Sequence, residues 1–159
     1  MHLTWGLALA VCCVAVYTDL RERRIPNLLT VSALVVGFAL NGWLVGLSGL
    51  TSSLYGVLLG LLLLFPFFLR GGIGGGDVKL LMALGALCGP GFLFYAFLYG
   101  AVAGGIGSLA VLVRHNRWRL ALAGLAVARE ATTGLSIPYA VPILIGVLVE
   151  CVRRTYGWF

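Results

Sequence analysis

Four long stretches of the chain contain no Asp, Glu, Lys or Arg, and they are residues 1–18, 25–69, 80–113 and 131–149. Crossing the roughly 30 Å of hydrocarbon in a bilayer takes a helix of about 20 apolar residues, so the second and third stretches have room for two helices each. The pattern therefore predicts a single domain with six transmembrane helices. We expect these helices at approximately residues 3–18, 28–47, 51–69, 77–89, 92–113 and 137–152.

The composition indicates that the hydrophobic segments belong to a membrane protein. Hydrophobic residues make up 61% of the 159 residues and charged residues 10%, whereas soluble domains carry about 25% charged residues. We therefore exclude a soluble globular domain and expect an all-α polytopic integral membrane protein that contacts the lipid bilayer. The positive charges near residues 1–18 follow the apolar run, and no small-residue cleavage site is evident, so we expect a retained first helix.

The basic residues predict how the helices are oriented. The net charge is +6, and the short cytoplasmic loops of membrane proteins carry an excess of Lys and Arg. Placing the loop 19–27 in the cytoplasm puts nine of the eleven basic residues on that side and leaves Arg153 and Arg154 outside. Both termini then face outward, and the glycine-rich loop after residue 69 faces the cytoplasm. The predicted membrane topology thus accounts for the positive net charge of the chain, and we do not expect nucleic acid as a partner.

A glycine-rich segment that ends in Asp77 separates the third and fourth predicted helices. Five of the seven residues 71–77 are glycine, so the backbone can bend sharply and another chain can approach it closely. Asp77 and Asp19 are the only two aspartates in the chain, and both lie at the predicted cytoplasmic ends of apolar stretches. A charged side chain within a membrane segment costs about 2.5–3.5 kcal/mol, which makes such a residue a functional candidate.

Two carboxylates that share one water molecule can hydrolyse a peptide bond. Two such groups within hydrogen-bond reach of one water do not readily both ionise, so one serves as a base and the other as an acid. The pair titrates as a unit, and the two roles are not assigned to one residue or the other. Asp19 and Asp77 are the candidate catalytic pair because the predicted topology brings both to the same membrane face.

Simpler roles exist for the same residues. Asp19 could pair with Arg23 one helical turn away, and Asp77 could cap the N-terminus of the fourth helix, which we expect to begin at or just after it. Lys79 lies two residues from Asp77 and so points away from it on a helix, which favours a membrane anchor or a substrate contact. Asn27 is expected to cap the second helix, after the extended backbone that Pro26 favours.

Other features predict packing and loops. Glycine pairs four residues apart allow close contact between membrane helices, and they occur at Gly42 and Gly46, Gly56 and Gly60, and Gly100 and Gly104. We expect the outer turn between the fourth and fifth helices at residues 88–91, an interfacial helix at 118–129, and a helix start at 136–138. The four cysteines have no CxxC spacing, so they support neither a zinc site nor a thioredoxin-like motif; a disulfide between Cys88 and Cys151 stays open.

The glycine-rich segment resembles the GxGD signature of membrane aspartyl proteases, here Gly74, Gly76 and Asp77. Continued through Lys79, it is similar to the type IV prepilin peptidase family. The resemblance extends to Asp19 with the downstream residues 24–27, and to residues 137–139. It implies that Asp19 and Asp77 are catalytic, and that the following residues bind substrate or shape the site: Gly74, Gly75, Gly76, Lys79, Pro26, Asn27, Pro138 and Tyr139.

The resemblance also implies a substrate and a location. Members of that family remove a short basic leader from pilin-like precursors, at the cytoplasmic face of a prokaryotic plasma (inner) membrane. Longer members carry a cytoplasmic insertion with two CxxC pairs and also methylate the new terminus, whereas this chain has only residues 21–26 there. It therefore resembles the short branch associated with tight-adherence (Flp) pili, and the resemblance implies cleavage without methylation and without a metal or cofactor. Ala140 stands where family members commonly have glycine, which weakens the expectation of backbone contact there.

Three alternatives remain open at this point. An archaeal-type preflagellin peptidase shares the motif and belongs to the same class of enzyme. A small transporter would use Asp19 and Asp77 as coupling carboxylates beside a broken helix, but the charges cluster on one side rather than across both halves of the membrane. A purely structural assembly subunit would tolerate Asp77→Asn, which a catalytic pair would not.

Overall fold

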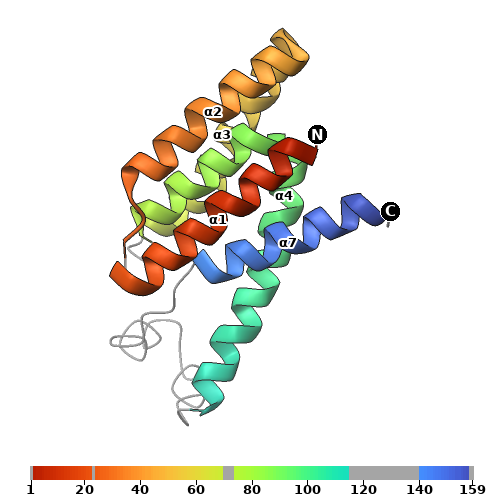
Figure 1. The fold of residues 1–159 in the computed structure, drawn as a ribbon. Helices are drawn as coiled ribbons and strands as arrows, with labels where there is room; N and C mark the ends of the chain where they lie inside the picture. Colours follow the sequence, from red (N-terminus) through yellow and green to blue (C-terminus); the bar gives the residue numbers. More distant parts are fainter. Residues whose placement is uncertain (1, 23, 70–73, 115–139, 158–159) are drawn as a thin grey trace.

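The computed structural model describes residues 2–22, 24–69, 74–114 and 140–157, and these residues fold into helices (Figure 1). The helices are α1 (His2–Glu22), α2 (Asn27–Val45), α3 (Leu47–Leu69), α4 (Gly75–Arg114) and α7 (Ala140–Tyr156). Within these ranges no β-strand occurs, so the predicted all-α class is confirmed. The expected interfacial helix at 118–129 and the helix start at 136–138 lie outside the described residues.

Four of the helices are long and apolar enough to cross a membrane. They cover Leu3–Glu22, Asn27–Val45, Leu47–Leu69 and Gly75–Ala110. α4 is the central helix. In an 18-residue apolar stretch of α4, 61% of the residues are buried, whereas the buried share of such a stretch is at most 22% in each of the other three helices. It packs against each of the other described helices. Six separate spans remain a prediction, with α7 in the place of the sixth.

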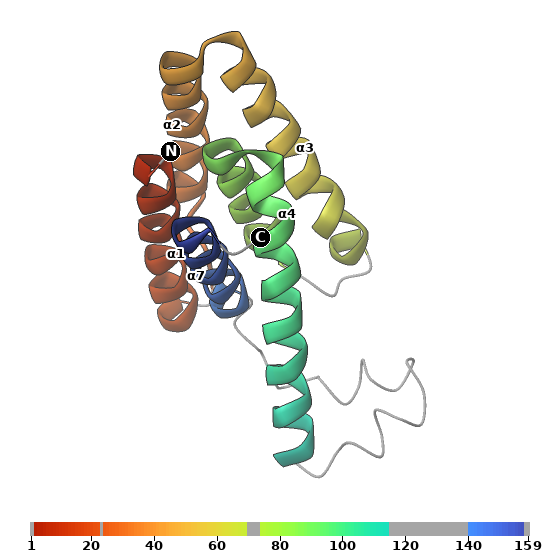
Figure 2. The same ribbon diagram turned by 90° about the vertical axis from the view of Figure 1, so that its right-hand side faces the viewer.

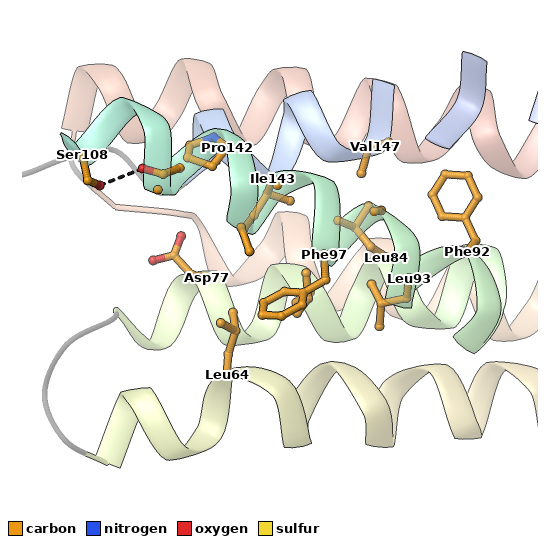
Figure 3. A pocket seen from close by; sticks show the side chains of 16 residues that line it. Leu64, Asp77, Leu84, Phe92, Leu93, Phe97, Ser108, Pro142, Ile143 and Val147 are labelled. Carbon is orange, nitrogen blue, oxygen red and sulfur yellow. Dashed lines mark hydrogen bonds between the residues drawn. The ribbon is translucent and has the colours of Figure 1, made fainter. Parts of the chain in front are cut away.

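α4 contains the predicted outer turn and so accounts for two of the expected spans. Gly89 has φ +79° and ψ 171°, which breaks the helix, and Pro90 follows it. The second half then leaves in a new direction and extends beyond the other helices (Figure 2). Asp77 in the first half and Ser108 in the second half lie at one end, and Phe92 lies at the other (Figure 3). The expected helices 77–89 and 92–113 are therefore the two arms of one hairpin.

Two polar side chains hold this hairpin in place. Pro90 has no N–H, so the carbonyl oxygen of Ala86 loses the donor that a regular helix would supply. Ser53 Oγ in α3 donates to that oxygen at 2.8 Å, and Asn41 Nδ2 in α2 donates to it at 2.8 Å. Asn41 Nδ2 also lies 2.9 Å from Ser53 Oγ and 3.2 Å from the carbonyl oxygen of Leu87. The break in α4 is thus satisfied by the neighbouring helices, which explains two buried or partly buried polar side chains among hydrocarbon.

Close glycine contacts bring α3 and α7 against α4. A Cβ atom added at Gly56 would overlap the carbonyl oxygen of Gly85, and one added at Gly60 would lie 2.8 Å from the carbonyl oxygen of Leu81. A Cβ atom at Gly100 would lie 2.8 Å from the carbonyl oxygen of Pro142 in α7. The predicted packing roles of these two glycine pairs are confirmed.

The pair Gly42 and Gly46 behaves differently from the other two. Gly42 faces the side chain of Leu50, at 3.0 Å from an added Cβ atom, where α2 and α3 meet. Gly46 has φ +70° and ends α2, and no atom lies within 4 Å of its added Cβ. The prediction of helix packing is therefore wrong for Gly46, which serves as the positive-φ residue of a helix terminus. As a consequence α3 begins at Leu47, before the expected residue 51.

A buried ion-pair cluster fastens the end of α7. Glu150 is fully buried and accepts hydrogen bonds from Arg153 Nε at 2.7 Å and Arg154 Nε at 2.6 Å. The two guanidinium groups lie over rings in the second half of α4, Arg153 over Tyr95 at 4.6 Å and Arg154 over Phe92 at 5.5 Å. The carboxylate of Glu150 thus partly neutralises the charges of the two arginines that the topology prediction places outside. The arginines in turn tie α7 to α4 through the two rings.

The ends of the helices fall into two groups. Figure 1 shows the N- and C-terminal ends on the same side of the bundle, with the end of α1 and the start of α4 on the opposite side. The three helices α1, α2 and α3 separate the N-terminal end from the start of α4, which places these two points on opposite sides. Which side faces the cytoplasm remains a prediction that rests on the basic residues.

Because Ser53 donates to the backbone where α4 breaks, we expect it to contribute more to the stability of the protein than Ser48, another serine of α3. Ser53→Ala should lower the free energy of unfolding by about 0.6–1.7 kcal/mol, because a donor between membrane helices is lost. Ser48→Ala, which removes only an exposed hydrogen bond to Val45 within the same turn, should change it by less than about 0.5 kcal/mol. Unfolding of the purified protein in detergent measures both, and equal effects would contradict the capping role.

Candidate active site

Asp77 lies in the first turn of α4 and is nearly buried, with 9% of its surface exposed. The helix begins at Gly75, so the prediction that it begins at or after Asp77, with Asp77 as the N-cap, is wrong. The Asp77 carboxylate instead reaches back and accepts the backbone N–H of Gly74, as the third residue of a capping box does. A carboxylate offers about four acceptor positions, so this bond leaves acceptors for a water molecule.

Asp19 lies in the last turn of α1, which continues to Glu22 beyond the expected residue 18. Its side chain is half-buried, and its negative charge acts on Asp77. Among the described residues Asp19 is the charged group that acts on Asp77, and neither aspartate forms an ion pair with another of them. Arg23, the expected partner of Asp19, lies outside the described residues. The two carboxylates thus lie on separate helices, the charge of Asp19 reaches Asp77, and no described cation forms an ion pair with either of them.

The segment between α1 and α2 packs on the glycines before Asp77. Gly76 contacts Ile25, whose Cβ would lie 3.2 Å from a Cβ atom added at Gly76. Gly75 faces the ring of Phe68 at 3.4 Å from an added Cβ atom, and Gly74 faces the Asp77 carboxylate at the same distance. A side chain at Gly76 would have to displace Ile25, so the glycine allows the α1–α2 connection to approach Asp77.

Pro26 and Asn27 start α2 in an unexpected way. Pro26 is extended, as predicted, and it occupies the N-cap position, where its carbonyl oxygen accepts the N–H of Leu29 at 3.1 Å. Asn27 is the first residue of the helix and makes no side-chain cap, so the predicted capping role is wrong. Its Oδ1 instead accepts a hydrogen bond from Lys79 Nζ at 2.9 Å.

The Lys79–Asn27 hydrogen bond joins the starts of α2 and α4 at the end of the bundle that carries Asp77. Lys79 is exposed, two residues after Asp77, and points away from it as the helical spacing predicts. The structure thus brings together most of the expected site residues, namely Asp19, Pro26, Asn27, Gly74, Gly75, Gly76, Asp77 and Lys79. Pro138 and Tyr139 lie outside the described residues, and Ala140 begins α7 as a buried residue.

A cavity of about 250 Å³ extends from Asp77 into the bundle (Figure 3). Its walls come from the end of α3, both arms of α4 and α7, and apart from Asp77 and Ser108 its lining side chains are apolar or glycine. Ser108 donates to the carbonyl oxygen of Gly104 at 2.8 Å and is thereby satisfied within its own helix. The cavity was not evident from the sequence, because it forms only where the hairpin of α4 meets α7.

The described part of the chain contains neither a cluster of metal-binding side chains nor a disulfide bond. No group of three or more His, Cys, Asp and Glu side chains in the described ranges is arranged to hold a metal ion. All four cysteines are free, so the disulfide considered between Cys88 and Cys151 is not formed. Two aspartates lie at this end of the bundle, and one of them, Asp77, lines an apolar cavity.

Comparison with known proteins identifies similar chains. A family model described as the type IV leader peptidase family matches residues 6–109. The prepilin peptidase EppA of Methanococcus maripaludis is 36% identical over 73 residues, which cover 46% of this chain and 19% of that protein. The preflagellin peptidase of Methanocaldococcus jannaschii is 37% identical over 84 residues, or 50% of this chain and 35% of that protein. The chain thus matches about a fifth and a third of the lengths of these relatives. No solved structure matches.

The hydrogen bond between Lys79 and Asn27 predicts energetic coupling between α2 and α4. In a double-mutant cycle of Lys79→Ala and Asn27→Ala, the free energies of unfolding should be non-additive by about 0.5–1.5 kcal/mol, the net value of one hydrogen bond. Arg24→Ala is the matched control, since this exposed basic residue forms no described hydrogen bond with Asn27. Additive effects for the Lys79 pair would contradict the contact.

Proposed function

Because the chain belongs to the type IV leader peptidase family, we propose that it is an aspartic endopeptidase that uses Asp19 and Asp77 to hydrolyse a peptide bond at the membrane surface. One observation carries the proposal beyond family membership. The two aspartates come from separate helices, Asp19 acts electrostatically on Asp77, and no described cation neutralises either of them. A structural capping role would require Asp77 alone and gives no reason for Asp19 to lie beside it.

The proposed reaction follows from the chemistry of paired carboxylates. The ionised carboxylate takes a proton from a water molecule, the water oxygen bonds to the carbonyl carbon, and the protonated carboxyl donates to the carbonyl oxygen. The resulting diol then returns a proton to the pair, the C–N bond breaks, and the leaving nitrogen takes a proton to form an amine. The pair ends with one proton, as it began. Since the two groups titrate together, either aspartate can hold that proton.

The proposed substrate is a pilin-like precursor whose leader is removed. Support comes from the similar chains, one a prepilin peptidase and the other a preflagellin peptidase. These names favour the two precursor classes equally, so an archaeal-type preflagellin peptidase stands beside the pilin processing enzyme. We further propose the prokaryotic plasma membrane, with the site facing the cytoplasm, because nine of the eleven basic residues then lie inside. Leader removal without methylation follows from the short 21–26 connection.

The catalytic pair predicts the effect of two isosteric substitutions. Asp19→Asn and Asp77→Asn should each lower cleavage of a co-expressed pilin-like precursor by at least about 100-fold, because each removes an acid or base from the proton transfers. The mobility shift of the mature product measures cleavage, and immunoblotting confirms equal enzyme levels.

Glu22→Gln provides a matched control for these variants. Glu22 is an exposed carboxylate at the end of α1, close in sequence to Asp19. Its substitution removes one negative charge from the same region and should leave cleavage unchanged. Normal processing by either aspartate variant would overturn the proposed pair and would return the transporter and structural-subunit alternatives to consideration.

A further inference from the structure

The cavity beside Asp77 has a deep, closed end and an open side. Leu84, Phe92, Leu93 and Val147 line it and are fully buried, so its far end is hydrocarbon. Asp77 lies at the opposite end (Figure 3). A polar carboxylate at the entrance and an apolar interior suit a ligand that is polar where the reaction occurs and apolar beyond it.

Gly105 forms the open side of this cavity. It lines the cavity and is exposed, and an added Cβ atom would meet no atom within 4 Å. By contrast, the added Cβ atoms of Gly100 and Gly104 would lie 2.8 Å and 3.2 Å from Pro142, so α7 already fills the space beside these two glycines. No described neighbour therefore fills the space at Gly105, and a larger side chain placed there would occupy part of the cavity.

The volume fits one large side chain rather than a helix. Apolar cavities of about 150 Å³ already bind benzene in a protein interior, so about 250 Å³ accommodates an aromatic ring or a branched aliphatic group. A helix with its side chains is about 10 Å across and needs several times this space. The apolar lining offers no hydrogen-bond partner for a buried peptide backbone, whereas an apolar side chain needs none.

The depth of the cavity limits which side chain can occupy it. From Asp77 to Leu84 the first arm of α4 rises about 10 Å at about 1.5 Å per residue. An extended peptide that runs alongside the cavity, with its backbone outside the apolar interior, covers that distance in about three residues at about 3.3 Å each. The arm runs from the end with the aspartates toward the interior of the bundle, so these residues lie on the membrane-interior side of the bond that reacts.

We propose that this cavity is a specificity pocket that binds one apolar side chain of the precursor, within three residues of the cleaved bond on its membrane-interior side. The inference rests on the proposed peptidase function and adds the feature of the substrate that is recognised. A lipid acyl chain could fill the same apolar space, but it would give no reason for the cavity to begin at the carboxylate Asp77.

The test varies the size of the substrate side chain and of the pocket together. The probe is a pilin-like precursor that the wild-type enzyme cleaves, with Ala, Leu, Phe or Trp placed in turn at each of the three positions on either side of the bond. The wild-type enzyme should prefer Leu or Phe over Ala at one membrane-interior position, by on the order of 10- to 200-fold in kcat/KM. Gly105→Leu should abolish that preference and still cleave the Ala precursor.

Gly107→Leu is the matched control. Gly107 lies on the same helix, is exposed, has no atom within 4 Å of an added Cβ, and does not line the cavity. It should keep the wild-type preference. Ile143→Ala, which enlarges the pocket from α7, should shift the preference toward Trp, and it provides a second reading if Gly105→Leu fails to fold.

The outcomes separate this inference from the proposed function. An unchanged size preference in both Gly105→Leu and Ile143→Ala, a preference on the leader side, or an equal loss for all precursors with a Gly105→Leu enzyme that folds normally would overturn the pocket while leaving the peptidase intact. Cleavage by Asp77→Asn would instead overturn the peptidase, whatever the preference of the pocket variants.

Discussion

The electrostatic repulsion between Asp19 and Asp77 is the constraint on which the rest of the structure depends. Two carboxylates in an apolar environment cannot both remain charged without cost, and no cation among the described residues offsets either one. The end of α1 and the start of α4 must therefore be held together by other contacts. Ile25 of the α1–α2 connection on Gly76 and the Lys79–Asn27 hydrogen bond supply them at this end.

The remainder of the bundle holds α4 in position without much hydrophobic driving force, because lipid is as apolar as the helix surfaces. Backbone contacts at Gly56 and Gly85 bring α3 close, and Asn41 and Ser53 satisfy the carbonyl oxygens exposed where α4 turns back. At the far end, Glu150 fixes two arginines over aromatic rings of α4. A rigid hairpin results, and the space left between its arms and α7 is the cavity beside Asp77.

Much of this could be predicted from the sequence, because the signals are local or compositional. The all-α class followed from the uncharged stretches, the turn at Gly89 from its proline and glycine neighbours, and two packing contacts from glycine spacing. The scarcity of aspartate and the predicted topology placed Asp19 and Asp77 at the same end of the bundle, where the end of α1 and the start of α4 lie (Figure 1). The role of Asn27 could not be predicted, since it depends on Lys79 from another helix. The start of α4 was missed because Asp77 binds the backbone of Gly74 from the third position of the helix instead of serving as the N-cap. Ser53 and the cavity were hidden for the same reason: the hairpin that requires them exists only in three dimensions.

The pH dependence of cleavage tests the central claim most directly, because a shared pair must hold one proton to act. Measured as kcat/KM on one precursor, the rate should pass through a maximum, falling at low pH when both carboxyl groups are protonated and at high pH when both are ionised. Glu22→Gln should leave both limbs in place. A rate with a single limb, or none, across the range in which the enzyme stays folded would contradict the account of two aspartates acting on one water.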